Sequence, residues 1–172
     1  MAILKIAKMG HPILSKKAKI VDDPTDKKIR TLVQDMLDTL NDLGGSGVGL
    51  AAPQVHISLQ VVIFEQPLET PNQKSSKLVT LINPKIKSLT KKMDTDWEGC
   101  LSVPGLRGKV TRPNKIQYTG LDLNGNKIDT IAEGFHARVV QHECDHLFGI
   151  LYPQRMKNLE TLQFVSEARH WT

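Results

Sequence analysis

The most regular pattern of apolar and polar residues follows Asp23 and Pro24, in the first quarter of the chain. Apolar residues recur there at the spacing of one helix face: Ile29, Leu32, Val33, Met36, Leu37, Leu40 and Leu43. Asp23 suits an N-cap, Pro24 suits the first helical position, and Gly44 follows the last apolar residue. The pattern predicts an amphipathic helix from about residue 24 to residue 43, packed on the core and without chemistry of its own.

Shorter apolar runs in the middle of the chain predict strands. Buried strands are expected at 59–64 and 78–82, with a polar loop at 66–77 between them. Asn83 and Pro84 should break the second strand, and a short edge strand is expected at 86–89. Two further runs, 116–123 and 127–131, flank Asn124-Gly125, which is a strong hairpin signal.

Helical spacing returns in the last forty residues. One helix is expected from about residue 133 to residue 147, with Gly149 beyond its end. A final amphipathic helix would present Met156, Leu159, Leu162, Val165 and Ala168. The pattern predicts an α+β fold, with mostly antiparallel strands packed around the helix at 133–147 and amphipathic helices at both ends. The length of 172 residues predicts a single domain, residues 1–172.

Charge and cysteine usage narrow the classes of partner. The net charge is +5, but the basic residues are scattered and not interleaved with aromatics, which favours a solvated surface over a nucleic-acid groove. The mild positive field could still favour an anionic neighbour such as the ribosome. Two cysteines are too few for a disulfide framework and indicate a reducing compartment. With no apolar stretch of membrane-spanning length and no signal-peptide pattern, we expect a cytoplasmic monomer without a membrane partner.

The candidate chemistry is concentrated in the sequence HECDH, residues 142–146, an HExxH pattern within the helix expected at 133–147. Histidines four residues apart share one helix face and can bind one ion. Phe135 and Val139 lie on the same stripe, so His142 should continue the face that turns into the core. Glu143 lies about 100° around the helix and can reach a metal-bound water as a general base. Two ordinary buried histidines are the alternative, which the full pattern disfavours.

A catalytic metal site of this kind usually has three protein ligands and a water. A third histidine three residues after Gly149 would complete one known pattern, but that residue is Tyr152. The remaining candidates are Glu167, on the expected last helix, and Cys100. Cys144 lies on the opposite helix face from the histidines and is expected to be structural.

Three segments bear on that choice: GVGLAAPQ at 47–54, EGCLS at 98–102 and QHECDH at 141–146. In this order they resemble the motifs of the peptide deformylases, as do LINPKI and the SVPG that follows Cys100. Three short motifs at matching separations are far more specific than HExxH alone. The resemblance implies a hydrolase of protein biosynthesis that removes the N-formyl group from the N-terminal methionine of new polypeptides.

The resemblance also implies the metal site and its mechanism. Cys100, His142 and His146 would hold one divalent ion, with iron(II) favoured and zinc, nickel or cobalt able to replace it. The ion would lower the pKa of its water, and the resulting hydroxide would attack the formyl carbon. Glu143 would take the water proton and deliver it to the departing amine.

By the same resemblance, the side chain of Gln54 and the backbone N–H of Leu101 would stabilise the developing oxyanion. Substrate-binding roles are implied for Gly47, Val48, Gly49, Glu98 and Arg107.

Three residues depart from the family pattern at the border of the methionine pocket, where apolar residues are expected: Asp96, Trp97 and Arg138. They bear on side-chain preference and not on the reaction.

Two other functions are weighed against the deformylase. A zinc endopeptidase with Glu167 as third ligand leaves GVGLAAPQ and EGCLS unexplained. A structural metal module has no use for Glu143 as a base and normally closes all four positions of the metal.

Overall fold

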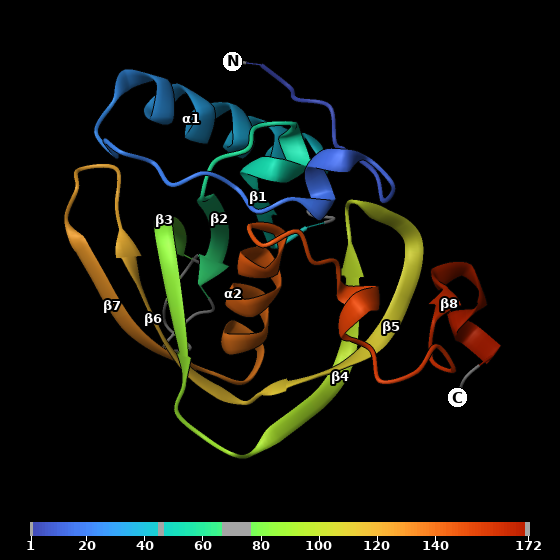
Figure 1. Cartoon of the computed structure of the whole chain (residues 1–172). Coiled ribbons are helices and arrows are strands. Elements are labelled where there is room, and N and C mark those ends of the chain that lie inside the picture. The colour runs from blue at the N-terminus through green and yellow to red at the C-terminus, as the bar shows by residue number, and fades with distance from the viewer. Residues whose placement is uncertain (1, 45–46, 67–76, 171–172) are drawn as a thin grey trace.

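The computed structural model describes residues 2–44, 47–66 and 77–170. Figure 1 shows one central helix, α2 (Gly134–His146), with strands on both sides of it and a second helix, α1 (Lys27–Asp42), across the top of the view. The α+β prediction, with antiparallel strands around the HExxH helix, is confirmed. Most of the loop expected at 66–77 lies outside the described residues.

One sheet has five strands in the order β1-β2-β3-β6-β7, and all of its pairings are antiparallel. Its strands are β1 (Gly49–Ala51), β2 (Val61–Gln66), β3 (Lys77–Ser88), β6 (Lys115–Leu121) and β7 (Lys127–Glu133). The second sheet has three antiparallel strands in the order β4-β5-β8. These are β4 (Met93–Cys100), β5 (Val103–Pro113) and β8 (Gln163–Phe164).

The apolar run of β2 is buried on both faces, because successive side chains of a strand point to opposite sides. Val62 and Phe64 pack in the cluster that contains the apolar face of α2. Val61 and Ile63 pack in the cluster that contains the apolar face of α1. The five-stranded sheet therefore lies between the two helices, and its α1 side supplies core without chemistry, as predicted.

Helix α1 starts later than predicted. Its N-cap is Asp26, whose carboxylate accepts a hydrogen bond from the Lys28 N–H at 2.8 Å. Asp23 instead accepts bonds from the backbone and hydroxyl of Thr25 within a turn. Both aspartates precede the apolar pattern, and the later one is the N-cap.

Strand β3 joins two segments that were predicted as separate strands. It continues through Asn83 and Pro84 with a register shift, and Asn83 adopts a left-handed φ of 52°. The side-chain amide of Asn83 stabilises this conformation, because it accepts a hydrogen bond from the Val21 N–H and donates one to the Val21 carbonyl. The predicted break is therefore a bulge. The predicted hairpin of β6 and β7 is confirmed, with Gly125 in its turn.

Strands β4 and β5 were not predicted, since few of their residues are apolar. The C-terminal helix is present but short: η4 (Val165–His170) is a 3-10 helix, and Met156 to Leu162 follow turns and bends after η3 (Tyr152–Arg155). Two further 3-10 helices are η1 (Pro12–Ser15) and η2 (Ala52–Val55). Within the described residues, no helix has the length and apolar character needed to span a membrane.

Candidate metal centre and active-site pocket

Helix α2 and the end of β4 bring three potential metal ligands together. His142 and His146 lie one turn apart on α2, and the ligand atoms of Cys100, His142 and His146 all lie within 4.8 Å of one another. The sulfur of Cys100 is 3.5 Å from Nε2 of His146. The β4–β5 register shifts between Gly99 and Cys100, and such a bulge can re-aim a side chain.

The donors in this cluster fit a divalent transition metal. One sulfur and two imidazole nitrogens suit borderline ions such as iron(II), zinc, nickel and cobalt, and three donors leave a position open. The sulfur of Cys100 accepts hydrogen bonds from the Ser102 N–H at 3.4 Å and from Gln54 Nε2 at 3.5 Å. Burial holds the pKa of His146 well below its usual value, so its ring is neutral, as a ligand requires.

His142 experiences a different field. Burial would lower its pKa, but hydrogen bonds with Cys100 and Glu98 raise it to about 10. The neighbours Glu98 and Cys100 raise this pKa because they stabilise positive charge on the His142 ring. The same neighbours would stabilise the positive charge of a divalent ion bound to that ring. Both histidines therefore suit a metal ligand, His146 through its neutral ring and His142 through its anionic neighbours.

Glu143 lies in the same cavity as Cys100 and His142, and this cavity measures about 540 Å³. The residue is almost fully buried, and within the described chain its Oε2 has no hydrogen-bond partner. Burial raises its pKa to about 7, which suits a group that exchanges protons near neutral pH. Gly49 of β1 packs against this carboxylate so closely that a Cβ there would lie 2.5 Å from Glu143 Oε1. Only glycine leaves Glu143 in this position.

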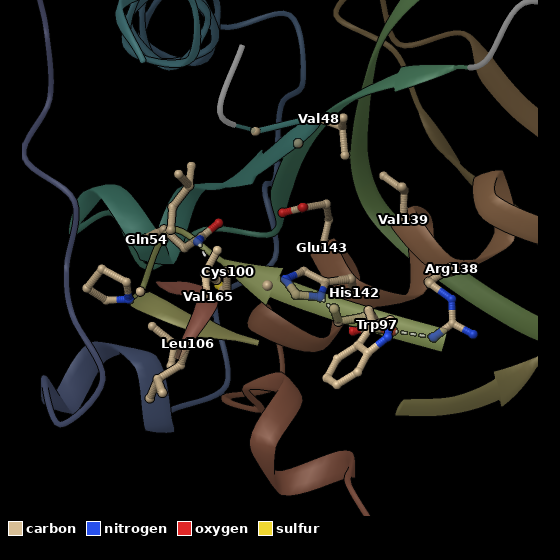
Figure 2. Close-up of a pocket in the computed structure, with 18 of the residues that line it drawn as sticks. Val48, Gln54, Trp97, Cys100, Leu106, Arg138, Val139, His142, Glu143 and Val165 are labelled. Carbon is tan, nitrogen blue, oxygen red and sulfur yellow. Dashed lines mark hydrogen bonds and ion pairs between the residues drawn. The ribbon is translucent and has the colours of Figure 1, made fainter. Parts of the chain in front are cut away.

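Gln54 is held in one orientation at the metal cluster. Its Oε1 accepts a bond from the Ala51 N–H at 2.9 Å, and its Nε2 points to Ser102 Oγ at 3.1 Å and to Cys100 Sγ. The residue is buried in η2, so the amide has little freedom to turn away. Both N–H bonds of this amide have acceptors, and the one directed at the sulfur points into the metal cluster, where an oxygen of a bound substrate could replace the sulfur as acceptor (Figure 2).

Glu98 lines the cavity, and its carboxylate is hydrogen-bonded to three other side chains of the protein. Oε2 lies 2.8 Å from His142 Nδ1, and Arg112 donates to both oxygens, at 2.7 and 3.0 Å. Arg138 adds a bond to Oε1 at 2.8 Å. Burial alone would raise the pKa of Glu98, but the bonds with His142 and Arg112 hold it well below its usual range. Glu98 is thus placed to orient His142, and its predicted contact with substrate stays a prediction.

The same ion network continues beyond Arg112. Its Nη1 donates to Asp145 at 2.8 Å, and Asp145 also accepts bonds from Arg155 at 2.6 and 3.1 Å. Arg112 is buried between two carboxylates, whereas nearly half of the Arg155 side chain is exposed. The network therefore ties the metal helix, β4 and β5 together through one buried guanidinium.

Arg112→Met is expected to destabilise the protein by about 3–5 kcal/mol, because it leaves buried carboxylates short of a partner. For a chain of this size that corresponds to a fall in Tm of roughly 10 °C, measurable by thermal unfolding. Arg155→Met removes a half-exposed partner of Asp145 and should cost about 1 kcal/mol or less. An equal fall in Tm for the two variants would show that the buried guanidinium of Arg112 stabilises the protein no more than the half-exposed one of Arg155.

The cavity brings together most of the predicted site residues. Gly47, Val48 and Gly49 line it, as do Gln54, Leu101 and two of the predicted metal ligands, Cys100 and His142. Trp97 and Arg138 line it too, whereas Asp96 is exposed and accepts a bond from the Trp97 N–H. Arg107 does not line it; its guanidinium stacks on the Trp97 ring at 4.2 Å.

The alternative third ligand, Glu167, lies on η4, largely exposed, 3.6 Å from the exposed His170 and outside the metal cluster. One sequence expectation about the helix face is wrong. Phe135 does not turn into the core with Val139; it is 58% exposed and lines the mouth of the cavity. Cys144 lies in the core, as expected.

Lys8, Arg112, Asp145 and Val165 are among the residues of this region that were not predicted from the sequence. Lys8 lines the cavity and donates a hydrogen bond to the Leu101 carbonyl at 3.0 Å. The only sequence signal for Arg112 is its place in an alternation with Gly108 and Val110 on β5. No sequence signal distinguishes Lys8 from the other scattered lysines.

Comparisons with known proteins identify the family of the chain. The family model for polypeptide deformylase matches residues 3–162. Peptide deformylase 1 of Nitrosomonas europaea is 50% identical over 91% of this chain and 89% of its own length, and peptide deformylase 2 of Ralstonia nicotianae is 49% identical over 94% and 92%. The Met-Ala-Ser-bound class I type b peptide deformylase of Acinetobacter baumannii is 38% identical, with a TM-score of 0.79 over 90% of this chain and 99% of that one. The chain therefore belongs to the polypeptide deformylase family.

Proposed function

We propose that this chain removes the N-formyl group from the N-terminal methionine of newly made polypeptides, with residues 1–172 as one catalytic domain. Its chief support is one observation: Glu143 shares a single cavity with Cys100 and His142, two of the three converging metal donors. Family membership supports the same reaction, since relatives of about 50% identity over most of the chain are peptide deformylases. Cys100, His142 and His146 are the proposed ligands of one divalent ion.

Four residues of the cavity have defined parts in the proposed hydrolysis: Glu143, Gln54, Leu101 and Glu98. When bound, the ion would make a water more acidic and polarise the formyl carbonyl. Glu143 takes a proton from the attacking water and passes it to the amine as the C–N bond breaks, so that formate and a free N-terminus result. Gln54 Nε2 and the backbone N–H of Leu101 donate to the carbonyl oxygen as negative charge develops on it. Glu98 acts indirectly, by holding His142 in position.

The backbone of Gly47, Val48 and Gly49 is the proposed binding edge for the substrate main chain. Strand β1 is an edge strand of the described sheet, because β2 pairs with it on one side only. An edge strand can accept an extended peptide through backbone hydrogen bonds. Arg107 is proposed to act through Trp97, on which it stacks, at the border of the methionine pocket.

Iron(II) is the proposed resident ion, with zinc, nickel or cobalt as replacements. A thiolate on an open iron(II) site is exposed to oxidation by oxygen or peroxide, and the Cys100 site has that character. We therefore expect iron-loaded protein to lose activity quickly in air and nickel-loaded protein to persist. Metal analysis of protein purified without oxygen identifies the resident ion. Activity is then followed against time in air for the iron-loaded and nickel-loaded forms, and equal lifetimes of the two activities would count against iron.

A cytoplasmic location is also proposed, supported by the free state of both cysteines, which suits a reducing compartment. Three expectations about partners stay predictions. The protein is expected to be a monomer, to contact the ribosome, and to bind neither a membrane nor a specific nucleic-acid sequence.

The proposed reaction predicts strong discrimination between formyl and acetyl groups. An acetyl group adds a methyl that must fit between the metal cluster, Gln54 and Leu101, and one misfitting methyl typically costs about 10–200-fold in rate. The lower electrophilicity of the acetyl carbonyl adds to this. We expect kcat/KM for N-formyl-Met peptides to exceed that for N-acetyl-Met peptides by at least this factor, with internal peptide bonds resistant.

The measurement compares the two peptides on one enzyme preparation with one metal content. Similar rates on both peptides, or ready cleavage of an unblocked internal bond, would reject the deformylase proposal in favour of an endopeptidase.

A further inference from the structure

The segment after residue 162 lies beyond the family match, yet it forms part of the cavity wall. Strand β8 pairs with β5 through Leu106–Phe164 and Arg107–Gln163, which places Val165 at the cavity. Val165 and Leu106 both line it, and about half of the Val165 side chain is exposed. The C-terminal segment therefore supplies an apolar group that the family motifs do not include.

The cavity has two walls of different character. Figure 2 shows Leu106 and Val165 on the side of Cys100, and Arg138 and Val139 on the opposite side, beyond His142. Arg138 and Val139 are buried, so their wall forms a deep recess. Leu106 is only half-buried and Val165 is exposed, so their wall is an open lip. A deep recess suits the residue that is always present, the methionine, and an open lip suits a residue that varies.

An extended peptide along β1 would use both walls. Successive side chains of an extended chain point to opposite sides, so a methionine directed to the deep recess places the second side chain opposite. We propose, on the basis of the proposed function, that Val165 and Leu106 contact the side chain of the second residue of the formylated peptide and favour an apolar one. Val165 is then a specificity-determining residue contributed by the C-terminal segment.

Phe164 provides a matched control within the same segment. It precedes Val165, it is 60% exposed, and it does not line the cavity. A serine at either position removes an exposed apolar group, but only Val165→Ser changes the lip. Any general effect of altering the segment would appear in both variants.

The test measures formate release from formyl-Met-Leu-Ala and formyl-Met-Ser-Ala by the full-length protein at equal metal content. We expect the wild type to prefer the leucine peptide by about three- to tenfold in kcat/KM, the gain from partial burial of one leucine side chain. Val165→Ser should bring this ratio to within about twofold of one, mainly through KM. Phe164→Ser should keep the wild-type ratio.

Three outcomes would overturn the inference while the enzyme still deformylates: a wild-type ratio near one, a wild-type ratio in Val165→Ser, or an equal loss of preference in both variants. Failure of the wild type to release formate from either peptide would instead reject the proposed function, so the two failures are distinguishable.

Discussion

Glu143→Gln is expected to lower kcat for formate release by about 10²–10⁴-fold, the usual contribution of a positioned proton-transfer group. Glutamine has nearly the shape of glutamate, so it should fill the space beside Gly49, but it cannot accept the water proton or return one to the amine. Both proton transfers of the reaction fail together. Because the carboxylate is not among the three clustered donors, the variant should keep its metal.

The measurement is kcat for a formyl-Met peptide together with metal content on the same sample. Glu133→Gln is the matched control, because Glu133 directly precedes the same helix but is largely exposed and pairs with Lys115 at the surface. It should retain both metal and turnover. Parallel loss of metal and activity in Glu143→Gln would identify Glu143 as a metal ligand, and the proposed proton shuttle would then be wrong.

The elements that the sequence predicted well are those whose own residues determine their burial. Helix α1 and strand β2 are apolar on the faces that pack, so the period of three to four residues or the short continuous apolar run reveals them. The positions of His142 and His146 were predictable for the same reason, because the helical period alone puts both side chains on one face.

The third ligand could not be derived from local pattern. Cys100 meets His146 across 46 residues of chain, and nothing in the composition of the strand before it indicates that meeting. Cys100 was preferred over Glu167 through the resemblance to a family, and the structure places Cys100, not Glu167, in the metal cluster.

The polar elements could not be predicted from the pattern of apolar residues. Strand β4 is mostly exposed and carries few apolar residues, so no alternation marks it. Arg112 resembles any solvated strand residue until Glu98 and Asp145, from two other elements, surround it. A buried ion network depends on partners brought together by the fold, so hydrophobic periodicity does not report it.

Cys100→Ser is expected to weaken metal binding by more than about 100-fold. Loss of an outer partner of a metal ligand typically costs 10- to 100-fold in affinity, and loss of a ligand should cost more. A serine hydroxyl keeps the approximate shape of the side chain, but it is a poor replacement for a thiolate on a borderline ion. Metal content after competition with a chelator measures the affinity, and the cobalt-loaded protein should lose its sulfur-to-metal absorption band.

Cys144→Ala is the matched control for that result, because the two cysteines differ in surroundings and not in chemistry. Cys144 lies in the apolar core on the far side of the helix, and burial raises the pKa of its thiol, so it remains protonated. Its removal should leave metal content unchanged. If Cys100→Ser bound metal as the wild type does while Glu167→Ala lost it, the third ligand would be the carboxylate, and the endopeptidase alternative would explain the site better than a deformylase.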